Sequence, residues 1–474
     1  MKIAVLGSRQ FTFEDQGRFA ELSGDSNPMH VDPVASRRTI YGDVVVHGVH
    51  SLLWALECLA ETVGAKCALS RLKTEFHRQV RPGDPVSCKL VESDGKNFTL
   101  MLEIGGETAA NIKVSFADGF PTAMTLSKNV KPSLCRDLTV DQMKTASGSL
   151  PLFLDEAALV KFFPKLLQTF PAFQIAEILA TTRLVGMECP GLHSLYSGHD
   201  LRFHDSGGAA ELSYQVTRSD DRFSMLWLTV KGPGLDGTIT AFARPRPSAQ
   251  PDMNAVSAIV DRGEFAGQRA LIIGASRGLG EITAKIIAAG GGEIHLTHHR
   301  GKEDAERVAA EIRLTGAKCE CLFYDAANPS ENLANRLEAA WKPTHLYYFA
   351  TPLISLEKTP RFSPEKFQNY TRFYVDGFAR AVEAVLKLGG ECLTVFYPST
   401  IFLEAFQKHT TEYCAAKAAG ELLCRHLEKS FPQVRVHCPR LPRMKTDQTS
   451  SLMPLETAEP MQVMLEAIRA MRLR

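Results

Sequence analysis

The chain has 474 residues, more than one hydrophobic core normally organises, so roughly two to four domains are expected. Hydrophobic residues make up 45% of it and charged residues 23%, and 54 Lys and Arg residues balance 53 Asp and Glu residues. This balance excludes a surface built to bind nucleic acid or an anionic membrane. No stretch approaches the roughly 20 apolar residues that span a bilayer, so membrane insertion is not expected.

The eleven cysteines are scattered without Cys-x-x-Cys pairs or His partners at metal-binding spacing, so no metal site is expected. The amino-terminal sequence MKIAVLGSRQ lacks the long apolar run of a secretory signal. Reduced thiols and a cytoplasmic location are the simplest interpretation.

The first part of the chain is expected to place one long helix against an antiparallel sheet. An apolar helix is predicted from about His47 to Thr62. Runs of alternating polar and apolar residues then predict strands at Val86 to Val91, Phe98 to Ile104 and Asn111 to Phe116.

A second pattern of the same kind follows, with FPAFQIAEILATTRLVG as its helix and GLHSLYSGHDLRF as its first strand. Further strands are predicted at Glu211 to Thr217 and Phe223 to Val230. The stretch GLHSLYSG is similar to HGVHSLLW, which begins at His47. We therefore expect an internal duplication, with its joint around residues 120 to 155.

A linker is expected at Arg244 to Asp252, RPRPSAQPD, because prolines and small polar residues interrupt the periodic segments there. After it, short apolar runs alternate with helical stretches, which predicts a doubly wound parallel sheet. The expected division is a first repeat at 1–120, a second at 121–245, a linker at 246–255 and a final domain at 256–474.

A first candidate site lies in FAELSGDSNPMHVD, residues 19 to 32, where a helix ends in a turn formed by Asn27 and Pro28. Asp25 and His30 lie on either side of this turn. Addition of water to a conjugated double bond needs a carboxylate and an imidazole that share one water, and the turn could aim both at one point. Taken alone, the pair is equally compatible with an Asp that opens a turn and a structural His.

Three ordered motifs resemble the MaoC-like (R)-specific enoyl hydratases of the hot-dog fold. They are Asp-x-Asn-Pro-x-His at residues 25–30, Val-His-Gly at 46–48 and Pro-Gly-Asp at 82–84. The resemblance implies that Asp25 and His30 bind and activate the water. It also implies an acyl thioester substrate, carried by coenzyme A or by an acyl carrier protein.

In that family a backbone N–H at the start of the central helix holds the thioester oxygen, and Gly48 is the candidate for this position. A helix N-terminus suits the task because its N–H groups and dipole stabilise a developing enolate. The alternative is that a small residue is needed there for close packing. The second repeat lacks the motif and is expected to be non-catalytic. It resembles the repeat that, in double hot-dog hydratases, makes room for a longer acyl chain.

A second candidate site begins in RALIIGASRGLGEITAKIIAAGG, which starts at Arg269. A short apolar strand, a glycine turn and an amphipathic helix follow one another here. Gly274, Gly278 and Gly280 leave room for a pyrophosphate to approach the helix N-terminus.

Farther on, Ser399 precedes Tyr413 and Lys417. A spacing of four places Tyr413 and Lys417 on one helix face, where the ammonium could lower the phenol pKa and allow proton exchange with a carbonyl. Ser399 would hold the substrate oxygen. A Tyr and a Lys at this spacing also occur on solvated helices, so the interpretation depends on the serine and the glycine turn.

Residues from about 265 to 450 resemble the short-chain dehydrogenase/reductase family, and in particular its 3-oxoacyl-thioester reductases. The resemblance implies that Ser399, Tyr413 and Lys417 are catalytic. It also implies cofactor contacts at the glycine turn and at a few further positions, which are Ser276, Arg277, Arg300, Asp325 and Thr446. The chain departs from the family pattern at three positions, with Tyr348-Phe349-Ala350-Thr351 for Asn-Asn-Ala-Gly, Tyr374 for a helix Asn, and Pro439-Arg440 for Pro-Gly.

The second strand of this domain ends in THHRGK, without the acid that usually selects NAD. Arg300 and Lys302 would lie near Arg277, and guanidinium groups suit a 2′-phosphate. NADP(H) is therefore expected in preference to NAD(H). The alternative is that these are solvated surface charges.

Together the sites predict a bifunctional enzyme that reduces a 3-oxoacyl thioester and dehydrates the product, or runs the reverse sequence. Two alternatives stay open: a hydratase whose reductase half has decayed, and a non-catalytic acyl-binding or assembly module. A homo-oligomer is also left open.

Overall fold

The computed structural model describes residues 3–119, 124–129, 133–205, 207–328, 330, 332–337, 340–354, 361–390, 392–453 and 455–471. The chain divides into two units, one of Met1–Arg246 with Ser451–Pro454 and the other of Pro247–Ser450 with Leu455–Arg474. None of the helices in the described ranges combines the length and the apolar character that a membrane crossing requires.

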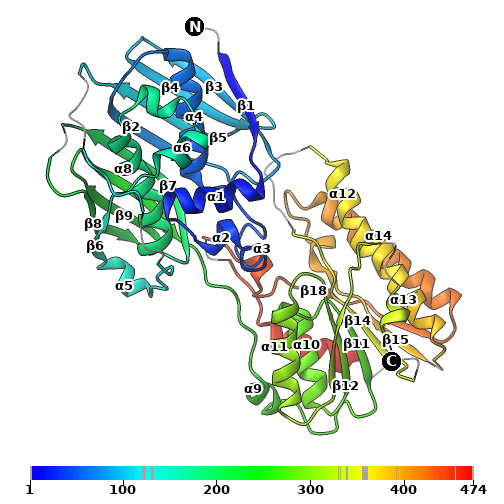
Figure 1. Cartoon of the computed structure of the whole chain (residues 1–474). Helices are drawn as coiled ribbons and strands as arrows, with labels where there is room; N and C mark the ends of the chain where they lie inside the picture. Colours follow the sequence, from blue (N-terminus) through cyan, green and yellow to red (C-terminus); the bar gives the residue numbers. More distant parts are fainter. Residues whose placement is uncertain are drawn as a thin grey trace. The chain divides into compact units, whose positions relative to one another are not determined.

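The first unit is built on an antiparallel sheet, which has ten strands within the described residues (Figure 1). Its strands run in the order β1 (Ala4–Gln10), β3 (Pro85–Ser93), β4 (Asn97–Ile104), β5 (Glu107–Phe116), β2 (Leu69–Phe76), β7 (Ser194–Phe203), β10 (Leu235–Ala243), β9 (Met225–Lys231), β8 (Glu211–Asp220) and β6 (Ser147–Pro151). Each half of the sheet contains five strands, and β2 and β7 pair antiparallel at the joint. The predicted duplication is thus visible as two half-sheets joined side by side.

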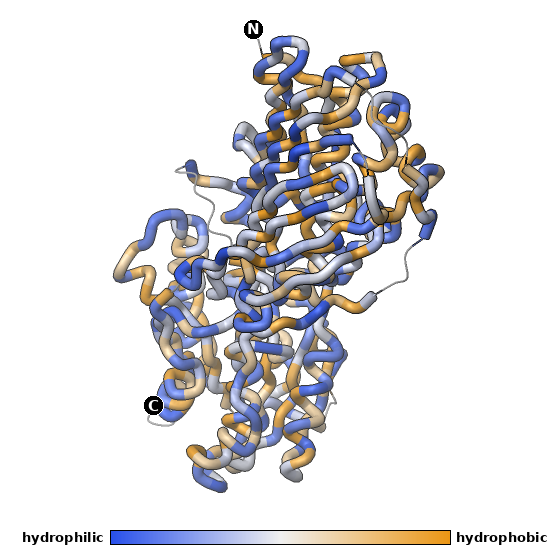
Figure 2. Tube along the Cα trace, turned by 90° about the vertical axis from the view of Figure 1, so that its left-hand side faces the viewer, coloured by the Kyte–Doolittle hydropathy of each residue, from blue (hydrophilic) through white to orange (hydrophobic). Residues whose placement is uncertain are grey.

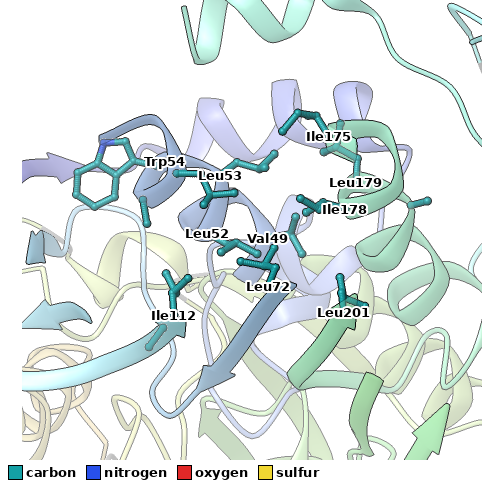
Figure 3. Packing of buried hydrophobic residues seen from close by; sticks show 14 of the residues in the cluster. Val49, Leu52, Leu53, Trp54, Leu72, Ile112, Ile175, Ile178, Leu179 and Leu201 are labelled. Atoms are coloured by element: carbon teal, nitrogen blue, oxygen red, sulfur yellow. The ribbon is translucent and has the colours of Figure 1, made fainter. Parts of the chain in front are cut away.

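Each half-sheet contributes one long helix to a shared core. These helices are α4 (Gly48–Val63) and α8 (Ala172–Arg183), and α8 continues into the π-helix η1 (Leu184–Glu188). Figure 3 shows Val49 and Leu52 of α4 close to Ile178 of α8, near Leu72 of β2 and Leu201 of β7. The shorter helices of this unit are α1 (Phe13–Ser23), α2 (Pro28–Val31), α3 (Pro33–Ser36), α5 (Val140–Lys144), α6 (Glu156–Phe162) and α7 (Leu166–Thr169).

The second unit contains a parallel sheet, as the alternating strand and helix pattern predicts. Its strands run in the order β13 (Cys319–Phe323), β12 (Glu293–His298), β11 (Arg269–Ile273), β14 (His345–Tyr348), β15 (Leu393–Phe396) and β17 (Val434–His437), and every pair is parallel. The order reverses at β11, which is the doubly wound arrangement. A separate pair, β16 (Ser399–Thr400) and β18 (Arg440–Leu441), is also parallel.

The helices of the second unit pack on this sheet. They are α9 (Met253–Ser257), α10 (Gly278–Ala289), α11 (Lys302–Arg313), α12 (Pro364–Thr371), the π-helix η3 (Arg372–Gly377), α13 (Phe378–Lys387), α14 (Thr411–Ser430) and α15 (Pro460–Met471), with short 3-10 turns η2 (Leu333–Arg336), η4 (Ile401–Leu403) and η5 (Asp447–Thr449). The predicted fold classes, hot-dog followed by a Rossmann-type sheet, are therefore confirmed.

The predicted linker is less irregular than its composition indicates. The units divide between Arg246 and Pro247, and α9 begins at Met253, within the range expected to be linker. The backbone N–H of Met253 donates to Glu311 at 2.7 Å, and the buried Lys285 donates to the carbonyl of Pro251 at 2.9 Å. The expected boundary between the repeats at residues 120 and 121 lies outside the described residues.

Polar and apolar residues alternate along the strands of the first unit, for example in β4, where every second side chain is buried. Figure 2 shows the two kinds of residue interleaved along the chain trace. This alternation places one face of the sheet against α4 and α8 and leaves the other more exposed.

Glu177 of α8 is fully buried, and its carboxylate accepts the backbone N–H of Gly234 at 2.8 Å. Burial raises the pKa of Glu177 to about 7. An acid whose pKa is raised by folding binds its proton more tightly in the native state, so stability falls as the pH rises from the ordinary Glu range through 7. We expect Glu177→Gln, which keeps the acceptor oxygen, to stabilise the first unit by on the order of 3 kcal/mol at pH 8.

The measurement is urea unfolding at pH 5 and pH 8, with Glu211→Gln on the exposed start of β8 as the control. The gain from Glu177→Gln should be large at pH 8 and small at pH 5. A gain that does not depend on pH would show that the substitution acts through packing and not through the charge.

Candidate active sites

The turn that carries Asp25 is anchored at both ends. Helix α1 ends at Ser23, and Gly24 follows in the left-handed conformation with φ 73°, which turns the chain sharply. Asn27 caps α2 by accepting the N–H of Met29 at 3.1 Å. Its amide donates to the carbonyls of Gly186 and Gly191, at 2.9 and 3.1 Å. The Asn-Pro turn of the first repeat is therefore fixed by the second.

Asp25 and His30 are both buried. One carboxylate oxygen of Asp25 accepts the hydroxyl of Thr182 at 2.7 Å, and the other accepts the N–H of Asn27 at 3.2 Å. Nδ1 of His30 lies 2.7 Å from the carbonyl of Val45. A carbonyl only accepts, so Nδ1 carries the proton and Nε2 of the neutral ring is the acceptor.

Burial raises the pKa of Asp25, an effect that the nearby His30 opposes. Burial likewise lowers the pKa of His30, opposed by Asp25. Both shifts disfavour the charged forms, as expected for two groups removed from water. Polar atoms of Asp25, His30 and His47 lie within 4.8 Å of one another, a separation that one water can bridge with two hydrogen bonds.

His47 is a site residue that sequence reasoning treated only as part of a motif. Its Nε2 lies 3.0 Å from the carbonyl of Asp25, and its Nδ1 lies 3.2 Å from Oε1 of Gln16. The ring stacks on that of His30 with centroids 3.8 Å apart. His47 therefore fixes the position of both predicted catalytic groups.

The structure brings Asp25, His30 and Gly48 to the wall of one cavity of about 130 Å³. Gly48 is the first residue of α4, as predicted. Gly186 of η1 also lines the cavity, and a Cβ there would lie 2.2 Å from the Asp25 carboxylate. Sequence reasoning missed Thr182 and Gly186, because neither belongs to a motif and both come from the second repeat.

The glycine turn in the second unit joins β11 to α10. The N–H of Gly274 donates to the Thr297 hydroxyl at 3.0 Å. A Cβ on Gly280 would lie 2.3 Å from the carbonyl of Gly274, so the helix start can pack against the turn only with glycine at this position. Ser276 is buried beside it. This shape fits a nucleotide pyrophosphate at the start of α10.

The other predicted cofactor residues lie around this turn. The Arg277 guanidinium is 3.0 Å from the buried Asp447 carboxylate, and the Thr446 methyl is 3.8 Å from the position of a Cβ on Gly278. Arg300 is exposed just after β12. Asp325 follows β13 and accepts the N–H of Ala327 at 3.0 Å. Sequence reasoning did not anticipate the pairing of Arg277 with a carboxylate.

Tyr413 and Lys417 lie one turn apart on α14, as their spacing predicts. Burial raises the pKa of Tyr413 to about 12, and the neighbouring Thr400 hydroxyl opposes this shift. Lys417 donates to the carbonyl of Pro398 at 2.7 Å. Burial lowers the pKa of Lys417 to about 7.

The Ser399 hydroxyl, predicted to hold the substrate oxygen, has a partner within the protein. It donates to Glu421 at 2.5 Å, and Glu421 also binds Arg440 at 2.8 Å. The hydroxyl beside Tyr413 is that of Thr400, the next residue of β16. Successive residues of a strand face opposite sides, so the hydroxyls of Ser399 and Thr400 lie on different faces of the strand. The signal that could have found Thr400 is the presence of a second hydroxyl in the same dipeptide.

Tyr374, which stands where the family has Asn, belongs to the π-helix η3 and is buried. Its hydroxyl lies 2.6 Å from that of Thr351, and its carbonyl accepts the Tyr397 hydroxyl at 3.0 Å. The Lys417 ammonium lies 4.0 Å from the centroid of the Tyr374 ring and 4.9 Å from that of Tyr397. When it is protonated, the buried amine of Lys417 can therefore form cation–π contacts with both rings.

Known families match both parts of the chain. The model described as MaoC like domain matches residues 5–110, and the model described as short chain dehydrogenase matches residues 268–456. The 3-hydroxyacyl-thioester dehydratase Y of Mycobacterium tuberculosis is 28% identical over 111 residues, 23% of this chain and 38% of the relative. The peroxisomal hydratase-dehydrogenase-epimerase of Saccharomyces cerevisiae is 33% identical over 78 residues, 16% of this chain and 8% of the relative. The chain thus covers well under half the length of either relative.

Solved structures of short chain dehydrogenases are similar to part of the chain. A short chain dehydrogenase from Burkholderia cenocepacia in complex with NADP has a TM-score of 0.40 at 19% identity, with 44% of this chain and 91% of that chain covered. One from Escherichia coli complexed with NADPH has a TM-score of 0.41 at 20% identity, with 44% and 93% covered. On the family matches and the observed fold, the chain joins a MaoC like hot-dog domain in its N-terminal part to a short chain dehydrogenase domain.

Proposed function

We propose that the first unit interconverts a 2-enoyl thioester and a 3-hydroxyacyl thioester by adding or removing water. The observation that carries this proposal is the cavity in which Asp25, His30 and the N-terminus of α4 at Gly48 meet. The second repeat, with its Thr182 and Gly186, supports the site and has no chemistry of its own. The thioester is carried by coenzyme A or by an acyl carrier protein.

In the hydration direction, Asp25 and His30 hold the water between them. One of the pair takes a proton as the water oxygen bonds to C3, and a proton from the pair reaches C2, so the pair ends with as many protons as it began. The N–H at the start of α4 holds the thioester oxygen, where negative charge develops. Thr182 keeps the Asp25 carboxylate in place throughout.

For the second unit we propose reduction of a 3-oxoacyl thioester with NADPH, which supplies the hydride to C3 when it is bound. The turn of Gly274, Gly278 and Gly280 holds the pyrophosphate. Thr400 donates a hydrogen bond to the substrate carbonyl, and Tyr413 gives its proton to the same oxygen. The reduced product is a 3-hydroxyacyl thioester, the substrate of dehydration in the first unit. Linking the two steps on one chain raises the effective concentration of the intermediate.

One specific observation favours a second candidate, a hydratase with a degenerate reductase half. Tyr374 replaces the Asn of the family, and its ring and that of Tyr397 lie beside Lys417. The buried hydroxyl of Tyr397 occupies the carbonyl of Tyr374. A tyrosine at this position supplies no side-chain amide, and the Tyr374 hydroxyl is already paired with that of Thr351.

The hydratase proposal predicts that Asp25→Asn or His30→Ala lowers hydration of a crotonyl thioester by about 10²–10⁴-fold, because a positioned acid or base is removed. NADPH-linked reduction by the same variants should persist. Loss of absorbance of the enoyl thioester measures the first activity. Asp32→Asn is the matched control, since Asp32 lies in the same segment and only caps α3. Equal loss in the control would mean that the turn, and not the pair, was damaged.

The reductase proposal predicts that Thr400→Val and Tyr413→Phe each lower NADPH oxidation with an acetoacetyl thioester by at least about 10²-fold. Ser399→Ala should cost much less, because its hydroxyl is bonded to Glu421. The reverse order of effects would return the role to Ser399. If the unmutated chain binds NADPH but never oxidises it, and Tyr374→Asn creates activity, then the second candidate is correct and the reductase half is degenerate.

The cofactor proposal predicts that NADPH binds more tightly than NADH. Charge-assisted hydrogen bonds are worth roughly 1.5 to 3 kcal/mol, so Arg300→Ala or Arg277→Ala should weaken NADPH binding about tenfold or more and leave NADH nearly unchanged. Calorimetric titration gives both constants. Lys318→Ala is the control, because Lys318 pairs with Glu293 at the opposite end of β12. Equal affinities of the unmutated chain for both nucleotides would refute the assignment.

A further inference from the structure

The cavity beside Asp25 and His30 is small. Its volume is about 130 Å³, whereas an apolar cavity that holds benzene measures about 150 Å³. By this comparison the cavity accommodates an apolar group no larger than about six carbon atoms. Room for a long acyl chain, which the family resemblance led us to expect from the second repeat, is not found in this cavity.

An aromatic wall bounds the cavity. Phe76, the last residue of β2, lies against the start of α4, with a ring carbon 3.0 Å from the position of a Cβ on Gly48. Tyr196 of β7 meets the Phe76 ring edge to face, with centroids 5.6 Å apart. Both residues line the cavity. Because β2 and β7 are paired strands, the backbone fixes the positions of both rings.

The tyrosine is also fixed by its hydroxyl. Tyr196 Oη lies 3.0 Å from Nδ1 of His199, which is buried. Moving the Tyr196 ring aside would break this hydrogen bond inside the protein, so the wall resists opening.

The space between the two repeats is filled by the helix of the second repeat. Ile175, Ile178 and Leu179 of α8 are buried and pack toward α4, as Figure 3 shows. In a double hot-dog whose second repeat makes room for a longer chain, this space would have to be open. Here the second repeat keeps its helix and the helix keeps its large apolar side chains.

We propose that Phe76 and Tyr196 limit the acyl group of the hydratase site to a short chain, of about four to six carbons. This inference rests on the proposed hydratase function and names its substrate class. A longer chain would have to displace the Phe76 ring or the helix α8, and well-packed interiors do not yield such space without cost.

The test is a length series on the full chain, with trans-2-enoyl-CoA substrates of four, six, eight and ten carbons. We expect kcat/KM to fall by about 100-fold or more between four and ten carbons, because one methylene can change kcat/KM by about 10–200-fold in a hydrophobic pocket. Phe76→Ala should raise kcat/KM for eight and ten carbons relative to four by at least tenfold. If that variant is unstable, Phe76→Leu should shift the ratio in the same direction.

Two matched variants separate the wall from general damage. Tyr196→Phe keeps the ring but removes the hydroxyl that holds it at His199, so it should shift the length profile toward longer chains less than Phe76→Ala does. Phe98→Ala removes a buried ring that packs on Phe116 of the same sheet, away from the cavity, and should not change the ratio. Equal activity of the unmutated chain on four and ten carbons would overturn the length limit while leaving the hydratase intact. No hydration at any length would instead remove the proposed function itself.

Discussion

The first unit depends on the pairing of β2 with β7, which joins the two half-sheets into one. Across this joint the second repeat supplies the hydroxyl of Thr182 to the Asp25 carboxylate and the carbonyls that bind Asn27. A carboxyl group buried without such partners would cost several kcal/mol. A repeat without a catalytic motif is therefore still necessary to the chemistry of the other, and the two could not have been separated without rebuilding the site.

Much of the fold could be predicted from hydrophobic periodicity. Strands of the first unit alternate polar and apolar residues because one face of their sheet is more exposed, and strands of the second unit are apolar because both faces of a parallel sheet are buried. The sequence motifs pointed to Asp25, His30, Gly48 and the glycine turn. Each motif is a short segment whose shape is set by its own residues, so it can be recognised without knowing the rest of the fold. Thr182 could not be found in this way. It contacts Asp25 across 157 residues of chain, and only the sheet order brings α8 to the turn. A single sequence contains no local signal for such a contact.

At Ser399 and Thr400 the motif predicts the segment but not which of the two hydroxyls faces Tyr413. In a two-residue strand a shift of one position exchanges the inward and outward hydroxyls. The surroundings of Lys417 could not be predicted either. The four-residue spacing from Tyr413 predicts the face of α14 on which Lys417 lies, but not that the rings of Tyr374 and Tyr397 lie beside its amine. Burial lowers the pKa of Lys417 to about 7, so near neutral pH its charge depends on what binds beside it.

Both sites border a π-helix, η1 beside Asp25 and η3 beside Lys417. Such a segment holds one residue more than an α-helical turn of the same height, and it is common at functional sites. In the continuous run of α12, η3 and α13, the additional residue is taken up within one turn, and Phe378 and Val382 after it are buried in the core. Loss of one residue from η3 would turn this segment into an ordinary α-helical turn and keep the helix after it in phase. Loss of one residue from α13 would instead rotate everything after it by roughly 100° about the helix axis. A single-codon deletion in η3 would therefore be milder than one in α13, so this run accepts a change of length at one place and not at the other.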